Sequence, residues 1–219
     1  MKAWRVLIPL APLLMAGGIA CAGEVQTPPD LQMPAHWRAC ETDAYLADQD
    51  MAGVAVRKAP GTAAALITML PALRMKPAGG GLAHYGAEVA VVGTDGQGWF
   101  LIERAEYAPE DDADAPPRKV QTYGATGKVY QGRGWVHGSR LGTSIVATRG
   151  LRAGSERTAH IAHPMVQKDS DPEIEARLLD CEGRAVRLRF NDKGQVREGW
   201  IRPDSGREKL CSNQRTTCS

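Results

Sequence analysis

The residues of this chain best suited to chemistry are its five cysteines, Cys21, Cys40, Cys181, Cys211 and Cys218. A cysteine can attack a substrate as a thiolate, ligate zinc or form a disulfide. No pair has the CxxC spacing of a zinc site, and Cys21 lies in a segment that we expect to be lost or lipidated on export. Four cysteines then remain, and an even number in an exported chain indicates two disulfides and no free thiol.

The connectivity of these cysteines has three alternatives. We favour Cys211–Cys218, because the short segment between the two can loop back on itself, and Cys40–Cys181 then follows by elimination. The first bridge closes a small loop, whereas the second constrains a long one and would lock the two halves of the chain together.

Other motifs that resemble catalytic or binding sites are incomplete. His160 and His163 are close in sequence, but a strand or loop would not bring both imidazoles together, and no third ligand accompanies them. The run Gly79-Gly80-Gly81 lacks the Lys-Ser/Thr of a phosphate-binding loop, and no Gly-x-Ser-x-Gly elbow occurs. The sequence therefore predicts no catalytic residue, no cofactor and no metal site.

The N-terminus has the layout of a secretory signal: residues 1–5 include Lys2 and Arg5, residues 6–16 form an apolar stretch, and Ala20-Cys21-Ala22 follows. We expect cleavage after Ala22 and a periplasmic protein. Lipidation at Cys21, which would make the protein a lipoprotein, is the alternative. The apolar stretch is too short to remain as a transmembrane helix.

Removal of residues 1–22 takes away Lys2 and Arg5 and no acidic residue, which leaves 25 basic and 25 acidic side chains. Nucleic-acid binding depends on concentrated positive charge, so nucleic acid is not an expected partner.

The rest of the chain reads as short strands. Residues 23–37 are proline-containing and predict an extended tether. From Cys40 onward, short apolar runs are separated by Gly, Pro, Asp and Asn, a pattern typical of β-strands. Residues 62–70 are the exception, because their alanines favour one or two helical turns.

An internal repeat is the most informative feature of the sequence. Its three blocks occur in the same order in both halves: Val54–Gly61 with Arg149–Ser155, Glu88–Gly96 with Glu175–Gly183, and Gly132–Gly138 with Arg197–Pro203. The last block carries a Gly-Trp-aliphatic core in each half. We interpret each half as a small β-barrel with Trp135 or Trp200 as its large apolar plug.

The segments Gly53–Gly61, Leu70-Pro71, Gly96–Trp99 and Gly134–Leu141 resemble a bacterial SH3-like (SH3b) domain over residues 40–142. Ala55 stands where that family usually has Asn. The second half keeps Leu151–Gly154 and Gly199-Trp200-Ile201, with Ser155-Glu156 in place of Pro-Gly. The resemblance implies exported all-β barrels that bind peptidoglycan or peptides.

The expected organisation is a signal peptide (1–22), a tether (23–37), a first barrel (38–142) with an inserted loop (105–126), a second barrel (143–205) and a disulfide-closed tail (206–219). We expect a non-enzymatic envelope adaptor that binds a peptidoglycan fragment or a protein partner, using the groove between the barrels and the loops at 74–87 and 105–126. An inhibitor or immunity protein against an envelope enzyme is the alternative. The candidate ligand-binding residues are Tyr85, Trp99, Tyr107, Glu110, Asp111, Asp112 and Tyr123.

Overall fold

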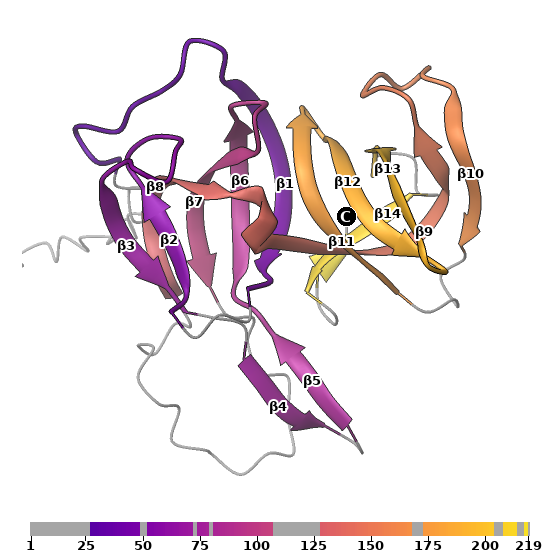
Figure 1. The fold of residues 1–219 in the computed structure, drawn as a ribbon, viewed down its shortest axis with the longest axis horizontal. Helices are drawn as coiled ribbons and strands as arrows, with labels where there is room; N and C mark the ends of the chain where they lie inside the picture. The colour runs from indigo at the N-terminus through magenta and orange to yellow at the C-terminus, as the bar shows by residue number, and fades with distance from the viewer. Residues whose placement is uncertain are drawn as a thin grey trace, which may run out of the picture.

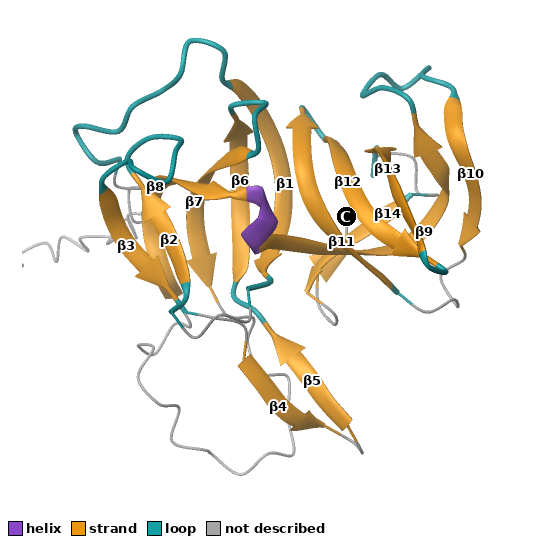
Figure 2. Cartoon of the chain, viewed as in Figure 1, coloured by secondary structure: helices purple, strands orange, loops and turns teal. Residues whose placement is uncertain are grey.

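The fold is all-β in a computed structural model that describes residues 27–48, 52–71, 74–78, 81–106, 128–167, 173–203, 208–213 and 217–218 (Figure 1). Within these ranges the only helical segment is a 3-10 turn, η1 (Gly138–Arg140), which is drawn in purple in Figure 2. No helix in the described ranges is long and apolar enough to span a bilayer.

The first half of the chain forms one end of a 13-stranded sheet, with the strand order β1-β6-β7-β8-β2-β3. A separate two-stranded hairpin, β4–β5, projects from it (Figure 1). The strands are β1 (Arg38–Leu46), β2 (Val54–Arg57), β3 (Leu66–Leu70), β4 (Arg74–Ala78), β5 (Gly81–Tyr85), β6 (Glu88–Thr94), β7 (Trp99–Glu106) and β8 (Lys128–His137).

The second half is organised around the long strand β9. Strands β10, β11, β13 and β14 all pair with β9, and β12 lies between β11 and β13. The pairings β9–β11–β12–β13 therefore return to β9. The strands are β9 (Leu141–Arg152), β10 (Ile161–Gln167), β11 (Ile174–Glu182), β12 (Ala185–Asp192), β13 (Gln195–Ile201), β14 (Lys209–Asn213) and β15 (Thr217–Cys218).

The repeat in the sequence corresponds to repeated strand pairing. In the first half Arg57 of β2 pairs with Trp135 of β8, and in the second half Arg152 of β9 pairs with Trp200 of β13. Each half also contains a three-stranded meander, β6–β7–β8 or β11–β12–β13. The residues that match in sequence thus occupy equivalent positions.

The glycine before each tryptophan has the same packing role in both halves. A Cβ on Gly134 would lie 2.3 Å from Val56 Cγ1, and a Cβ on Gly199 would lie 2.5 Å from Leu151 Cβ. Both distances are too short for real atoms. The Gly-Trp motif therefore allows the last meander strand to approach the opening strand of its own half closely.

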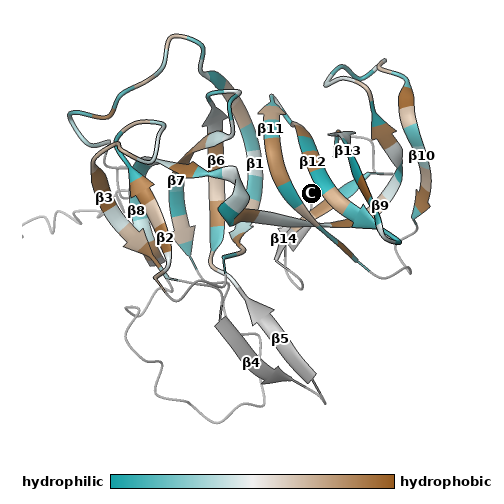
Figure 3. Ribbon diagram, viewed as in Figure 1, coloured by the Kyte–Doolittle hydropathy of each residue, from teal (hydrophilic) through white to brown (hydrophobic). Residues whose placement is uncertain are grey.

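The core follows the two-residue alternation of strands. Along β12 the residues Val186, Leu188 and Phe190 are buried while the arginines between them are exposed, and Figure 3 shows the corresponding brown and teal bands. Trp135 is fully buried, as predicted, and its Nε1 donates to the Gln32 carbonyl oxygen at 2.9 Å. Trp200 is only half-buried.

Several segments differ from the sequence-based expectation. Residues 66–70 form strand β3 and not a helix. Pairing with β2 gives their backbone N–H and C=O groups hydrogen-bond partners, whereas one or two helical turns would leave most of these groups unpaired. Much of the predicted loop at 74–87 is the β4–β5 hairpin. In the predicted tether, the backbone N–H of Gln32 donates to the Lys58 carbonyl oxygen at 2.8 Å, so this part is docked on the first half.

The expected boundary between the two barrels, at residues 142/143, falls inside β9. This strand pairs with β1 through Leu141 and Gly142 and with strands of the second half along the rest of its length. Both halves therefore contain part of the same strand.

Candidate functional site

The two halves meet at a bulge in β1. Ala39 pairs with Gly93 and Thr42 pairs with Val91, so that Cys40 and Glu41 together lie opposite Val92. A bulge leaves backbone groups unpaired and re-aims the side chains beside it. Here the Glu41 N–H donates to the Gly183 carbonyl oxygen at 2.7 Å, and the Gly183 N–H donates to the Ala39 carbonyl oxygen at 3.3 Å.

A disulfide and an ion pair reinforce this junction. Cys40 and Cys181 are bonded, with an S–S distance of 2.02 Å, which confirms the predicted bridge. Arg38 donates through Nη2 to both Asp180 carboxylate oxygens, at 2.7 and 2.6 Å. The bulge in β1 is therefore tied to the end of β11 by covalent, ionic and backbone contacts.

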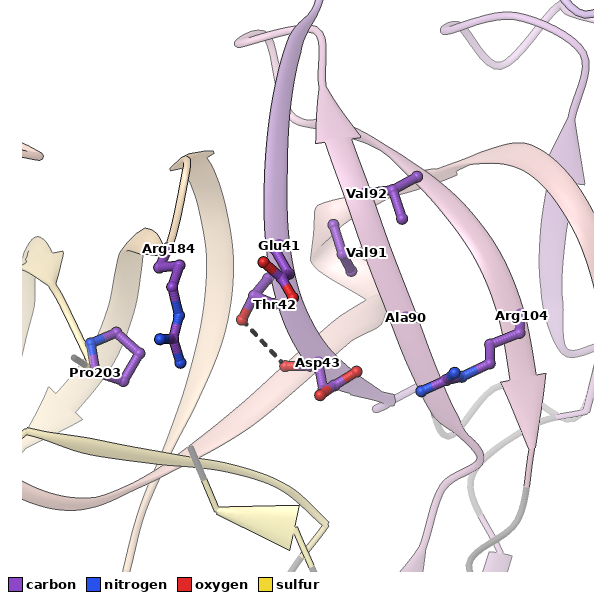
Figure 4. Close-up of a pocket in the computed structure, with 9 residues that line it drawn as sticks. All are labelled: Glu41, Thr42, Asp43, Ala90, Val91, Val92, Arg104, Arg184 and Pro203. Carbon is purple, nitrogen blue, oxygen red and sulfur yellow. Dashed lines mark hydrogen bonds between the residues drawn. The ribbon is translucent and has the colours of Figure 1, made fainter. Parts of the chain in front are cut away.

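A cavity of about 270 Å³ lies beside the junction (Figure 4). Arg184 and Pro203 approach it from the second half, while β1, β6 and β7 of the first half form the rest. Figure 4 shows β1 in the middle, Arg184 on one side and Arg104 on the other. The described lining residues are Glu41, Thr42, Asp43, Ala90, Val91, Val92, Arg104, Arg184 and Pro203.

The described lining of the cavity carries two carboxylates, both on β1, and two guanidinium groups. Partial burial raises the pKa of Asp43, the neighbouring charges of Glu88, Glu41 and Glu106 raise it further, and Arg104 opposes them. Figure 4 shows the Asp43 carboxylate pointing toward Arg104. Arg104 itself lies 3.5 Å from Glu106. The negative charge around Asp43 is therefore only partly neutralised.

Arg184 supplies an uncommitted positive charge. It is exposed in the turn between β11 and β12, directly after Gly183, and forms no hydrogen bond or ion pair with any residue that the structure describes. Glu41, on the facing strand, is also exposed and has no side-chain hydrogen bond or ion pair within the described ranges. Among the described lining residues, Arg184 and Glu41 thus present a cation and an anion to solvent without a charged partner in the described part of the chain.

Of the predicted ligand-binding residues, only Trp99 has a described side chain, and it does not line this cavity. Trp99 begins β7, is half-buried, and meets His137 edge to face with ring centroids 5.1 Å apart. Its position is fixed by Asp95, whose Oδ1 accepts from the Trp99 N–H at 2.9 Å. Tyr85 ends β5, with its side chain outside the described part, and Tyr107, Glu110, Asp111, Asp112 and Tyr123 lie outside the described residues.

The other predicted chemical groups are spread over the second half. His160 precedes β10 and His163 lies within it, so they do not share the face of a helix. Among described residues, no three His, Cys, Asp or Glu side chains are grouped to hold a metal. Cys211 is disulfide-bonded and pairs in register with Cys218 of β15, a placement compatible with the predicted Cys211–Cys218 bridge, which stays a prediction.

The cavity residues were missed in the sequence because they belong to no motif. One available signal was the Cys40–Cys181 pairing, since any bridge between two strands also brings together the residues beside each cysteine. Glu41 follows Cys40 directly, and Arg184 lies three residues after Cys181. The bulge that aims Glu41 into the cavity leaves no equivalent trace in composition or spacing.

Chemically, this arrangement suits recognition by charge. The described lining residues offer carboxylates, guanidinium groups and the hydroxyl of Thr42, whose Oγ1 lies 3.4 Å from the Asp43 carbonyl oxygen. No family model, curated protein or solved structure matches this chain.

Proposed function

We propose that this protein is a non-enzymatic binding or adaptor protein of the bacterial envelope, exported to the periplasm, that recognises a peptidoglycan fragment or a peptide. Its two halves would be tandem SH3-like barrels. The observation that carries the proposal is the charged cavity at the junction, bounded by both halves and held by the Cys40–Cys181 disulfide.

The strand pairings support the barrel interpretation. In the second half the pairings run from β9 through β11, β12 and β13 back to β9, and closure of this kind removes exposed sheet edges. The Arg57–Trp135 and Arg152–Trp200 pairs support two copies of one unit. The 3-10 turn η1 follows the Gly-Trp-Val-His segment of β8, which is one of the segments that resemble SH3-like domains.

The junction supports a binding role for the space between the halves. Binding sites gain from rigid supports, because a preorganised site loses less conformational entropy when a ligand binds. The disulfide is compatible with an oxidising compartment, where such bonds persist.

The test is co-sedimentation of the mature protein with purified peptidoglycan sacculi over a range of salt concentrations. Retention is expected, and the Arg184→Ala variant should be retained less well. Arg149→Ala is the matched control, because Arg149 is also exposed in the second half but does not line the cavity. No retention of the wild-type protein, or release of soluble fragments from the sacculi, would overturn the proposal.

The same experiment addresses the alternative of an inhibitor or immunity protein. Failure to bind sacculi, together with stoichiometric inhibition of a purified envelope hydrolase, would replace the adaptor hypothesis by the inhibitor hypothesis. Assaying sacculus hydrolysis with and without the protein measures this directly.

A further inference from the structure

The junction cavity combines opposite charges in a small volume, and this combination limits what it can bind. Its volume of about 270 Å³ lies just below the range of typical small-molecule sites. A ligand of one or two amino-acid residues fits this size, whereas a disaccharide would extend beyond it.

The nine described lining residues include no aromatic side chain. A sugar ring is commonly held by an aromatic face, which offers a flat apolar surface. The apolar contribution comes instead from Ala90, Val91, Val92 and Pro203, which are small. The lining therefore favours the peptide part of a wall fragment over its glycan part.

The charges favour a ligand that carries both signs. Asp43 is partly buried near Glu88, Glu41 and Glu106, and Arg104 offsets their charge only in part, so a ligand cation would stabilise the ionised Asp43 carboxylate further. Arg184 has no anionic partner among the described residues and presents a guanidinium, whose planar fork suits a carboxylate. A purely anionic ligand would be repelled by the acidic side chains, and a purely cationic one would leave Arg184 unpaired.

Resting on the proposed function, we infer that the cavity binds the ends of a short peptide as an ampholyte, with an ammonium group facing Glu41 and Asp43 and a carboxylate paired with Arg184. The two charges come from opposite sides of the junction. Binding would therefore require both halves in their observed arrangement.

The experiment is isothermal titration of the full mature protein, at low ionic strength, with alanylalanine and two blocked analogues. N-acetyl-alanylalanine lacks the ammonium group, and alanylalaninamide lacks the carboxylate. We expect alanylalanine to bind and each analogue to bind roughly tenfold more weakly or worse, since each loses one charge-assisted contact.

Variants assign the two ends. Arg184→Ala should bind alanylalanine and alanylalaninamide equally, because the carboxylate then has no partner. Glu41→Gln combined with Asp43→Asn should instead abolish the discrimination against N-acetyl-alanylalanine. Arg149→Ala and Glu156→Gln, which change exposed charges away from the cavity, should behave as wild type. A cooperative thermal unfolding transition shows that each variant is folded, whether or not its midpoint shifts.

The outcomes separate the two proposals. Sacculus binding without alanylalanine binding would overturn the ampholyte inference and leave the proposed function standing. Alanylalanine binding without sacculus binding would support the ampholyte site and overturn the wall assignment. Equal binding of alanylalanine and both analogues would also refute the inference, because recognition would then not depend on charge.

Discussion

Removal of the Cys40–Cys181 disulfide is expected to lower the free energy of unfolding more than removal of any single side-chain contact. The bridge joins residues separated by 141 positions. Without the bridge the unfolded chain gains conformational entropy, and for a loop of that length the chain-entropy relation gives a loss of about 5 kcal/mol in the free energy of unfolding at 25 °C. The whole free energy of unfolding of a domain this size is about 5–15 kcal/mol. Cys40→Ala/Cys181→Ala should therefore be marginally stable or unfolded at 37 °C.

The assay is equilibrium urea unfolding followed by tryptophan fluorescence. The double variant should show a lower midpoint and a larger m-value, because an unfolded chain without the long cross-link exposes more surface. Cys211→Ala/Cys218→Ala is the matched comparison: if these two are bonded, their short loop is worth about 2–3 kcal/mol on the same relation. A loss below about 1 kcal/mol for Cys40→Ala/Cys181→Ala, or one smaller than that of the comparison variant, would refute the entropic reasoning.

Three further predictions concern single side chains. Gly134→Ala should lower the free energy of unfolding by about 1–3 kcal/mol in urea titrations, because the new Cβ would lie 2.3 Å from Val56 Cγ1. Adding Val56→Ala in the same chain should recover part of the loss. If the effects of the two substitutions on the free energy of unfolding simply add, the steric explanation is contradicted. Asp43→Asn should raise the urea midpoint at neutral pH and have no effect near pH 3. The pKa of Asp43 is raised in the folded state, so ionisation of this carboxyl destabilises the folded protein as pH rises above the ordinary value of 3.8. A difference between variant and wild type that stays constant across pH would exclude this cause. Trp135→Phe should lower the free energy of unfolding by about 1–3 kcal/mol and make residues 27–37 accessible to limited proteolysis, because the hydrogen bond to the Gln32 carbonyl oxygen is lost. An unchanged cleavage pattern would show that this hydrogen bond does not hold the segment.

The all-β class could be predicted from sequence because the apolar residues alternate in short runs, as in Val186, Leu188 and Phe190. The repeat was also visible in the sequence. In both halves a glycine precedes the tryptophan, because the two strands approach too closely there for a larger residue. Cysteine counting supplied the long bridge. These features depend on local sequence patterns or on the even number of cysteines, and both can be read from a single sequence.

The candidate site could not be predicted in the same way. Glu41 and Arg184 are 143 positions apart, and their proximity depends on the bulge at Cys40 and Glu41 and on the backbone bonds of Gly183. The helical propensity of residues 62–70 was overridden by pairing with β2, which no local pattern reveals. Trp99 was selected for its aromatic ring, but it does not line the cavity, and the described lining residues include no aromatic side chain.

The strand β9 makes the molecule indivisible. Repeated units in many proteins can be separated, shuffled or expressed alone, because each completes its own hydrogen bonding. Here β9 begins with the two residues that pair with β1, Leu141 and Gly142, and a cut within the strand would divide a strand that both halves use. An engineered second half would therefore have to begin before Leu141 to keep this strand whole.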